Sequence, residues 1–486
     1  MDVPLTDEMI ARQTPEAQSI IRSLLEIIQR QQATIDALIA RVDVLTARVK
    51  ELEEALGQLP KSPLNSSVPP STEHPHSKSL PPRSPTKRPR GGQSGHPKHE
   101  RTLLPPENCH EVVTLKPTTC RGCGAALDGT DPEPLRHQVW EIPLPQPLVT
   151  EYQRQRLTCS CGCTTCAELP EGVPEHTSGP RLIAVACFLM ACCRLSKSRA
   201  AFALTNLFGV PVSPALMVKL QNHATTALDP CYQELKSALP TTTVAHCDET
   251  PTKQGTQKAW IWVAATPLFT VFAIALTRAA SAIQGLLGTK YRGIVISDRY
   301  GGYNIYDRRR QICWAHLKRD IQALIDAGGE AKDVGEKLMA CLHKVFGHWH
   351  DYCCGKIGRI ALTRRINNDA RSPMWQTLQT GLHSGHGPTR ALCRDLFERW
   401  RQLWRFVECP GVEPTNNRAE QVLRHAVIWR KLSFGTQSAS GSRFVETLLS
   451  IIETCRQQGR NLLDVITAAI EARYHRQPAP SLVGEV

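Results

Sequence analysis

The sequence has 486 residues, of which 41% are hydrophobic, so it is long enough for two to four domains and apolar enough to fold most of them. Lys and Arg number 58 against 45 Asp and Glu, and the net charge of +13 points to a polyanionic partner, with DNA or RNA first. No signal peptide and no apolar run of about 18 residues occurs, so the sequence predicts a cytoplasmic protein and excludes a membrane one.

Residues 16–58 carry an apolar seam whose members are spaced alternately by three and four residues. This heptad pattern predicts a coiled coil that joins copies of the chain into a homo-oligomer, with the polar Gln31 fixing the register. An alternative is one amphipathic helix packed on its own chain. The members of the seam are Ile21, Leu24, Ile28, Gln31, Ile35, Leu38, Val42, Leu45, Val49, Leu52 and Leu56.

Residues 59–101 change abruptly in composition, with ten prolines and only two acids, and predict an extended linker. Its basic end includes Lys87, Arg88 and Arg90. These cations are candidate contacts to DNA phosphates, and the alternative is a merely solvated tether.

Residues 102–172 hold two groups of closely spaced cysteines, separated by a stretch with strand-like alternation. Two cysteine knuckles on a short hairpin predict a zinc ribbon-like module in which four thiolates hold a structural Zn²⁺, against the alternative of free thiols. Because the second group is crowded, which four of the six residues bind remains open at this point. The candidates are Cys120, Cys123, Cys159, Cys161, Cys163 and Cys166.

Residues 175–240 are helical by pattern and contain two helices joined by a turn near Gly209. Ser213 as cap and Pro214 at the first helical position open the second helix, as in a helix-turn-helix. Lys219 would lie on its outer side as a DNA contact. Any two packed helices produce a similar pattern, which is the alternative.

Residues 241–435 begin with three short apolar strands, followed by a helix, a fourth strand, "GIVISD", and a strand-like "QICWAH". This order is that of an α/β ribonuclease H-like fold, in which the first and fourth strands are parallel neighbours. The pattern predicts that the first strand stops at Asp248, before a Thr-Pro turn. Asp248 and Asp298 would then lie about 5 Å apart at one sheet edge. An Asp-Glu pair that caps a turn is the simpler alternative.

Two carboxylates this close repel each other unless a cation joins them, and oxygen ligands favour Mg²⁺ or Mn²⁺. Glu420, in a helix read from about residue 416, is the candidate third acid of a two-metal site. Its alternative role is the third position of a capping box with Asn417 as N-cap.

Cations cluster after the fifth strand and along the Glu420 helix and are candidate DNA contacts: His316, Lys318, Arg319, Arg424, Arg430 and Lys431. By pattern alone, a buried, hydrogen-bonded core residue is the alternative for His316. A helical insertion at about residues 330–410 carries four tryptophans, which either fill its core or stack on unpaired bases. Residues 436–486 predict a further helical region.

The combination of "HCDETPT", "VISDRYGGYN", "CWAHLKRD" and "EPTNNRAEQVLRHAVIWRK" resembles the catalytic region of the insertion-sequence-66-type transposases. The resemblance extends from about residue 20 to 475 and includes the coiled coil, the linker and the cysteine knuckles. It implies a DDE enzyme with a ribonuclease H-like core, whose catalytic, Mg²⁺-binding residues fall on Asp248, Asp298 and Glu420. One departure is Gln421, where such proteins often carry Arg.

The resemblance implies a transposase that cleaves DNA at the terminal inverted repeats of a mobile element and transfers the strand to target DNA, with small accessory proteins as further partners. Two alternatives stay open from the residues alone. One is a structure-specific nuclease on the same fold, and the other is a non-catalytic, zinc- and coiled-coil-containing DNA-binding regulator.

Overall fold

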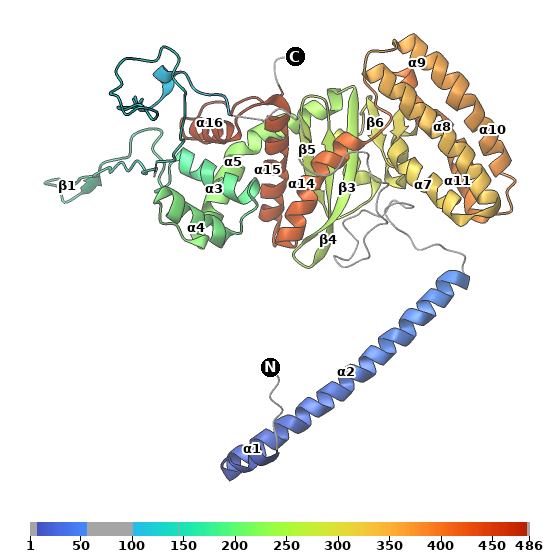
Figure 1. The fold of residues 1–486 in the computed structure, drawn as a ribbon, viewed down its shortest axis with the longest axis horizontal. Helices are drawn as coiled ribbons and strands as arrows, with labels where there is room; N and C mark the ends of the chain where they lie inside the picture. The colour runs from blue at the N-terminus through green and yellow to red at the C-terminus, as the bar shows by residue number, and fades with distance from the viewer. Residues whose placement is uncertain (1–6, 56–100, 144, 484–486) are drawn as a thin grey trace. The chain divides into compact units, whose positions relative to one another are not determined.

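A computed structural model describes residues 7–55, 101–143 and 145–483 of the chain (Figure 1). Past the N-terminal helices, the chain divides into two compact units. The smaller contains the described residues of 101–178 together with 185–221, and the larger contains 179–184 and 222–483. Within the described residues, no helix is both long and apolar enough to cross a membrane.

The N-terminal region consists of α1 (Asp7–Ala11) and the 41-residue α2 (Pro15–Ala55). The apolar seam runs along α2, and its side chains are exposed over half or more of their surface at Leu24, Leu38 and Leu45. The expectation of one long helix is therefore confirmed. The described residues leave this seam open to a partner.

The smaller unit contains little regular structure before its helices. The short η2 (Pro106–Asn108) is followed by a hairpin of β1 (Arg156–Thr158) and β2 (Thr164–Cys166). Residues 137–143, which alternate like a strand in the sequence, form none, and Val139 and Ile142 remain more than 80% exposed. Alternation alone does not hold a strand that has no sheet to pair with.

Three helices follow: α3 (Pro180–Ala191), α4 (Lys197–Phe208) and α5 (Pro214–Ala238). The turn between α4 and α5 has the expected chemistry. Gly209 ends α4 at φ 64°, and the Ser213 hydroxyl accepts the Leu216 N–H at 3.1 Å at the start of α5. The predicted helix, turn and helix are thus present.

The larger unit is built on a five-stranded mixed sheet of order β5-β4-β3-β6-β7. β3, β4 and β5 form an antiparallel meander, whereas β3, β6 and β7 are parallel, as expected for strands reached through helices. The strands are β3 (Val244–Gln254), β4 (Gln257–Ala265), β5 (Thr270–Ala275), β6 (Ile294–Ser297) and β7 (Arg310–Ile312). The connections are η3 (Leu239–Thr241), α6 (Ala280–Leu287) and η4 (Gly301–Arg309).

One face of this sheet is covered by α14 (Asn417–Ser433) and α15 (Ala439–Gln458), which α16 (Leu462–Tyr474) follows (Figure 1). The apolar stripe expected for α14 packs on the odd-numbered side chains of β4. The buried contacts are Ile261, Val263 and Ala265 of β4 with Ala419, Val422, Leu423 and Ala426 of α14.

A group of helices lies in the chain between β7 and α14, and its apolar core continues onto the sheet through Val244, Ile296 and Ile312. It is made of α7 (Trp314–Ala327), α8 (Gly329–Cys353), α9 (Arg359–Ile366), η5 (Asn367–Arg371), α10 (Ser372–Gly381), α11 (Gly387–Glu398), α12 (Trp400–Leu403) and α13 (Arg405–Glu408). Trp400 lies 5.0 Å from Trp375 and 5.4 Å from Trp404, ring centre to ring centre, and Trp404 is fully buried. The tryptophans of this insertion therefore fill its core.

Candidate active site

Asp248 and Asp298 lie on neighbouring parallel strands. β3 pairs with β6 through His246 and Ile296, and two further residues in this register bring Asp248 opposite Asp298. β6 ends at Ser297, so Asp298 is the first residue beyond it. The predicted meeting of these two acids at one sheet edge is what the register produces.

The Thr-Pro turn expected after Asp248 is absent from this described segment, because β3 continues to Gln254. Thr250 and Pro251 pair with Ile261 and Trp260 of β4. Pro251 has no N–H to donate, and it is tolerated because the paired residues of β3 and β6 stop at His246, which leaves that edge of β3 free. The change in the sequence at Asp248 thus marks the end of the parallel pairing rather than the end of the strand.

Asp248 and Glu249 point to opposite faces of the sheet, since successive strand residues alternate. Asp248 lies opposite Val263, on the face that α14 covers. Burial raises the pKa of Asp248 well above its ordinary range, and repulsion from Asp298, Glu249 and Glu420 raises it further. The Glu249 N–H, which donates to Asp248 Oδ1 at 2.9 Å, opposes this only in part.

Glu249 is held on the other face by two partners that sequence reasoning missed. Its side chain is only 2% exposed, and Arg278 donates to its Oε1 from Nε at 2.9 Å and from Nη2 at 2.7 Å. Tyr303 donates its hydroxyl to Oε2 at 2.7 Å. Burial and the charge of Asp298 nevertheless leave the pKa of Glu249 raised. The two Tyr residues of "SDRYGGY" were the available signal, because the second of them is Tyr303.

The backbone around Asp298 is fixed by a fully buried arginine at the start of β7. Arg310 donates to the Asp298 carbonyl and to the Tyr300 carbonyl, the latter at 3.0 Å. Its Nε donates to the Ser297 hydroxyl at 3.0 Å. Asp298 Oδ1 also accepts the Tyr300 N–H at 3.0 Å. Burial lowers the pKa of Arg310 to about 10, which leaves it charged at neutral pH.

Glu420 lies in the first turn of α14, and the capping-box alternative is wrong. The cap is Asn416 rather than Asn417, which puts Glu420 one position beyond that of a capping box. The Asn416 N–H donates to Cys313 Sγ at 3.1 Å, and its side-chain amide donates to the Cys247 carbonyl at 2.7 Å. These two bonds anchor the start of α14 beside Asp248. They leave the Glu420 carboxylate free for another role.

His316 and Glu420 face each other with Nδ1 3.4 Å from Oε1. Both atoms are buried and neither has a hydrogen-bond partner among the described residues. His316 lies in the first turn of α7 rather than on a strand, because β7 ends at Ile312 and the helix starts at Trp314. Cys313, the cap of α7, brings its sulfur to the same place: ligand atoms of Cys313, His316 and Glu420 all lie within 4.8 Å of one another.

The remaining predicted DNA contacts lie on several elements. Lys219 is exposed on α5, Lys318 is exposed on α7, and Arg319 beside it is half-buried. On α14, Arg424 and Lys431 are exposed and Arg430 is half-buried. Lys87, Arg88 and Arg90 lie outside the described residues.

The six candidate zinc ligands of the smaller unit lie in and beside two separate turns. The Gly124 N–H donates to the Cys120 carbonyl, and the Gly162 N–H donates to the Cys159 carbonyl, both at 2.9 Å. The Cys123 N–H lowers the pKa of the Cys120 thiol, and the Cys161 N–H lowers that of Cys159. These turns therefore pair Cys120 with Cys123 and Cys159 with Cys161. Within the described part of the chain, no three of the six cysteines lie within 4.8 Å of one another, so the zinc site stays a prediction.

Comparison with known families and proteins gives two family matches. The model described as "Transposase IS66 family" matches residues 176–443, and a "Family of unknown function (DUF6444)" matches residues 6–102. "Uncharacterized protein y4hP" of Sinorhizobium fredii is 23% identical over 385 residues, covering 71% of this chain and 68% of that protein. "Uncharacterized protein y4qI" of the same organism is 23% identical over 304 residues, covering 56% of each.

Proposed function

The chain belongs to the Transposase IS66 family, and from this premise we propose that residues 241–435 form the catalytic core of a DNA transposase that cleaves an insertion sequence at its ends and transfers the freed strand. The observation that carries the proposal is the charge cluster around Asp248. Asp298 and Glu420, from two other elements, both lie close enough to raise its pKa. We refer to Asp248, Asp298 and Glu420 as the acid cluster.

The strand order β5-β4-β3-β6-β7 supports a ribonuclease H-like core. In chain order this sheet reads 3-2-1-4-5, with only the second strand antiparallel to its two neighbours. The acid cluster then takes one residue from the first strand, one from the end of the fourth and one from a helix that covers the sheet. This is the placement that the family resemblance implies for a DDE site.

The acid cluster has the chemistry of a Mg²⁺ or Mn²⁺ site. Burial and then repulsion from neighbouring carboxylates hold the pKa of Asp248 high, and Glu420 Oε1 is buried without a hydrogen-bond partner among the described residues. A hard divalent cation held by Asp248, Asp298 and Glu420 would relieve both conditions. When bound, such ions would supply activation of the attacking oxygen and stabilisation of the leaving oxygen.

Both proposed steps are in-line displacements at phosphorus. In cleavage the oxygen of water bonds to phosphorus as the bond to the 3′-oxygen breaks and that oxygen leaves as a 3′-hydroxyl. In transfer the oxygen of this freed 3′-hydroxyl loses its proton and bonds to a target phosphorus, whose own bond to a 3′-oxygen breaks so that the target strand leaves with a 3′-hydroxyl. The residues around the acid cluster keep it in position for both. Glu249 is tied to Arg278 and Tyr303, and Arg310 fixes the turn that carries Asp298.

The other regions would bind DNA and assemble the complex. The basic linker, the cysteine-rich module with a structural Zn²⁺ and the α4–α5 pair with Lys219 are the proposed contacts to the inverted repeats. The exposed seam of α2 supports self-association, because apolar heptad positions that are half exposed in one chain can be buried between two. Such a protein would work in the bacterial cytoplasm at the nucleoid, alone or with accessory proteins.

Substitution of the acid cluster separates a transposase from a DNA-binding regulator. Asp248→Ala, Asp298→Ala and Glu420→Ala should each reduce Mg²⁺-dependent cleavage of a labelled inverted-repeat duplex by roughly 1,000-fold or more, because several kcal/mol of charge stabilisation is lost. Binding of the same duplex should stay within about twofold. Asp333→Asn, which neutralises an exposed acid on α8, is the matched control.

The outcomes distinguish the rival functions. Cleavage that survives all three substitutions would exclude the DDE proposal. It would favour a non-catalytic DNA-binding regulator whose preparation contains a contaminating nuclease. Cleavage of branched DNA without dependence on the repeat sequence, and without strand transfer, would favour a structure-specific nuclease on the same fold.

A further inference from the structure

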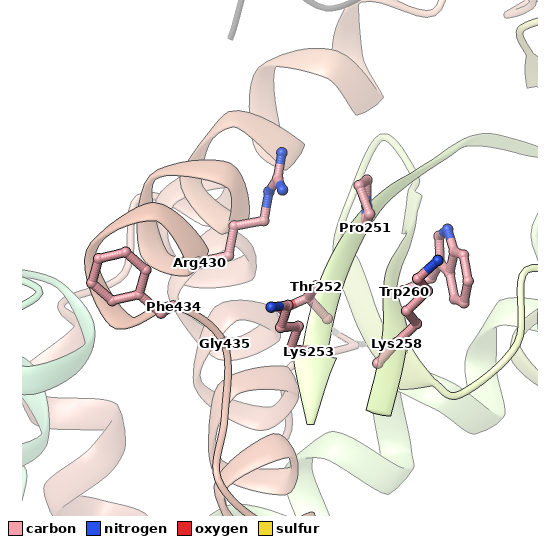
Figure 2. A pocket seen from close by; sticks show the side chains of 9 residues that line it. Pro251, Thr252, Lys253, Lys258, Trp260, Arg430, Phe434 and Gly435 are labelled. Carbon is pink, nitrogen blue, oxygen red and sulfur yellow. The ribbon is translucent and has the colours of Figure 1, made fainter. Parts of the chain in front are cut away.

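A cavity of about 350 Å³ lies between the distal half of the β3–β4 hairpin and the last turn of α14, away from the acid cluster. Figure 2 shows Arg430 and Phe434 on one side of it, Trp260 and Lys258 on the other, and residues of β3 between them. The lining residues that matter here are Thr252, Lys253, Lys258, Trp260, Arg430 and Phe434.

The lining of this cavity is cationic. Lys253 and Lys258 are directly opposite each other in the β3–β4 register, an arrangement of like charges that destabilises a hairpin. Arg430 adds a third cation, and its Nε is buried without a hydrogen-bond partner among the described residues. Of the described residues that line the cavity, none is acidic. By strand alternation the two lysines point away from the face that α14 covers. One anionic group would therefore offset the repulsion between the lysines, and a second one beside α14 would supply Arg430 with the missing acceptor.

Two aromatic rings share the lining with these cations. Phe434 ends α14 at φ 55°, a left-handed conformation that is strained for any residue with a side chain, and 83% of the residue is exposed. The loop beside it is bonded to the hairpin, since the Thr436 N–H donates to the Lys253 carbonyl at 2.9 Å. Gly435 is required there, because a Cβ would lie 2.5 Å from that same oxygen. The strained, exposed ring is therefore held in a fixed place next to a lysine.

The cavity and the acid cluster are connected by two elements that run side by side. Thr252 lies four residues beyond Asp248 and on the same face of β3, which is about 13 Å at strand spacing. Arg430 lies ten residues beyond Glu420 on α14, which is about 15 Å along the helix. At the axial rise of stacked duplex DNA, about 3.4 Å per nucleotide, this distance is about four nucleotides, and an extended single strand covers it in fewer.

We propose that this cavity binds a nucleotide of the DNA strand a few positions from the bond cut at the acid cluster, with its two flanking phosphates on the Lys253–Lys258 pair and on Arg430, and with its base against Phe434 or Trp260. This inference rests on the proposed function for the identity of the substrate. It adds a second contact point that would hold the strand in register while the acid cluster acts. A single-stranded nucleotide fits best, since a paired base keeps its faces stacked inside the duplex.

The test is binding of a fluorescently labelled single-stranded oligothymidylate of 16 nucleotides to the full-length chain, by anisotropy, across a series of salt concentrations without divalent ions. Lys253→Gln/Lys258→Gln should reduce the slope of log affinity against log salt by about 1.4, at about 0.7 per lost phosphate contact. Phe434→Leu keeps the backbone strain and should weaken binding roughly five- to 100-fold through lost stacking.

Two control variants remove comparable side chains at residues that do not line the cavity. Lys337→Gln/Lys344→Gln removes two exposed charges from α8, and Leu432→Ala removes an exposed side chain two residues before Phe434. Both should bind the oligonucleotide within about twofold of the wild type. Circular dichroism and thermal unfolding of each variant would show whether it is folded, so that weaker binding is not attributed to the cavity when the variant has unfolded.

Equal effects of the cavity variants and their controls would overturn the inference, as would the absence of oligonucleotide binding by the wild type. If the cavity variants instead lost only the binding of intact duplex DNA, or only the binding of an acidic peptide, the cavity would have a different occupant. That result would also overturn the inference. Because the assay needs no cleavage, these results are independent of the Asp248→Ala experiment, and a failed cavity leaves the proposed function standing.

Discussion

Tyr303 donates its hydroxyl hydrogen to Glu249 Oε2 across 2.7 Å, and this bond ties the residue beside Asp248 to the turn that follows Asp298. Tyr303 is fully buried and the Glu249 side chain is 2% exposed, so water does not compete for the bond. Its acceptor is one of three acids that repel one another, because Asp248 and Asp298 are its neighbours. The bond therefore bears directly on the geometry of the acid cluster.

Tyr303→Phe should lower the free energy of unfolding by about 1.5 to 3 kcal/mol, because a buried carboxylate loses a hydrogen-bond donor. Urea denaturation of the full chain would measure this. Tyr306→Phe is the matched control, since the Tyr306 hydroxyl is buried without a partner among the described residues. Its loss should change stability by no more than about 0.5 kcal/mol. Equal costs for the two variants would show that the Glu249 bond contributes nothing.

Asp248→Asn should stabilise the protein at neutral pH in the absence of divalent ions. Burial and neighbouring acids raise the pKa of Asp248, so the folded state holds the proton more tightly than the unfolded state. The contribution of Asp248 to the free energy of unfolding is fully present at a pH below the pKa of an ordinary carboxyl group. It is lost as the pH rises through the raised pKa of the folded state. The variant should therefore unfold several degrees above the wild type at pH 8, and this difference should vanish near pH 4.

Added Mg²⁺ gives the second arm of this experiment. A cation bound by the carboxylates would offset their repulsion, so several millimolar Mg²⁺ should raise the melting temperature of the wild type at pH 8 and leave that of Asp248→Asn nearly unchanged. A difference in melting temperature between the wild type and Asp248→Asn that does not grow from pH 4 to pH 8 without metal would contradict the raised pKa of Asp248.

The sequence was sufficient to predict the three-stranded meander, the parallel pairing of the first and fourth strands, and the position of Asp248 and Asp298 at one edge of the sheet. These follow from local patterns: apolar runs of strand length, one intervening helix and the rule that such a crossover joins parallel strands. Asp298 directly follows one of these runs. The position of Glu420 depended instead on the family resemblance, since a Glu in a first helical turn is also what a capping box needs.

The supporting contacts were beyond what the sequence reveals, because they join residues far apart in the chain. Pro251 looks like a turn residue and lies in a strand, since only the sheet shows that its edge is free. Arg310 looks like one of three surface arginines in "DRRRQ" and is fully buried. Glu249 looks like a spare acid, and its partners Arg278 and Tyr303 are 29 and 54 residues away.

Zinc should inhibit the proposed Mg²⁺-dependent cleavage of DNA. Cys313, His316 and Glu420 offer a thiol, an imidazole and a carboxylate within 4.8 Å, a set that favours softer ions over Mg²⁺ and would withdraw Glu420 from the acid cluster. Cys313→Ser keeps an acceptor for the Asn416 N–H and should raise the Zn²⁺ concentration for half-inhibition about tenfold or more. Cleavage assays with a zinc titration would measure this.

The control for the zinc experiment is Cys353→Ser, which alters an exposed cysteine at the end of α8. Zinc should inhibit this variant at the same concentration as it inhibits the wild type. Equal sensitivity of Cys313→Ser would show that zinc acts elsewhere, for example at the cysteine-rich module.

Leu38→Lys/Leu45→Lys should dissociate the protein into monomers. Both side chains belong to the apolar seam of α2 and are 57% exposed in the single chain, so they become buried only if a second helix covers them. Burying a leucine contributes about 1.5 to 3 kcal/mol, and four leucines per dimer give at least about 6 kcal/mol, or a more than 10,000-fold change in dissociation constant. Sedimentation velocity between about 0.1 and 50 µM would detect this dissociation.

Ala40→Lys/Ala47→Lys places the same charges on the opposite side of α2, where both residues are exposed, and should leave the mass of the assembly unchanged. A wild type that sediments as a monomer throughout, or equal dissociation by both double variants, would rule out the seam as the assembly surface.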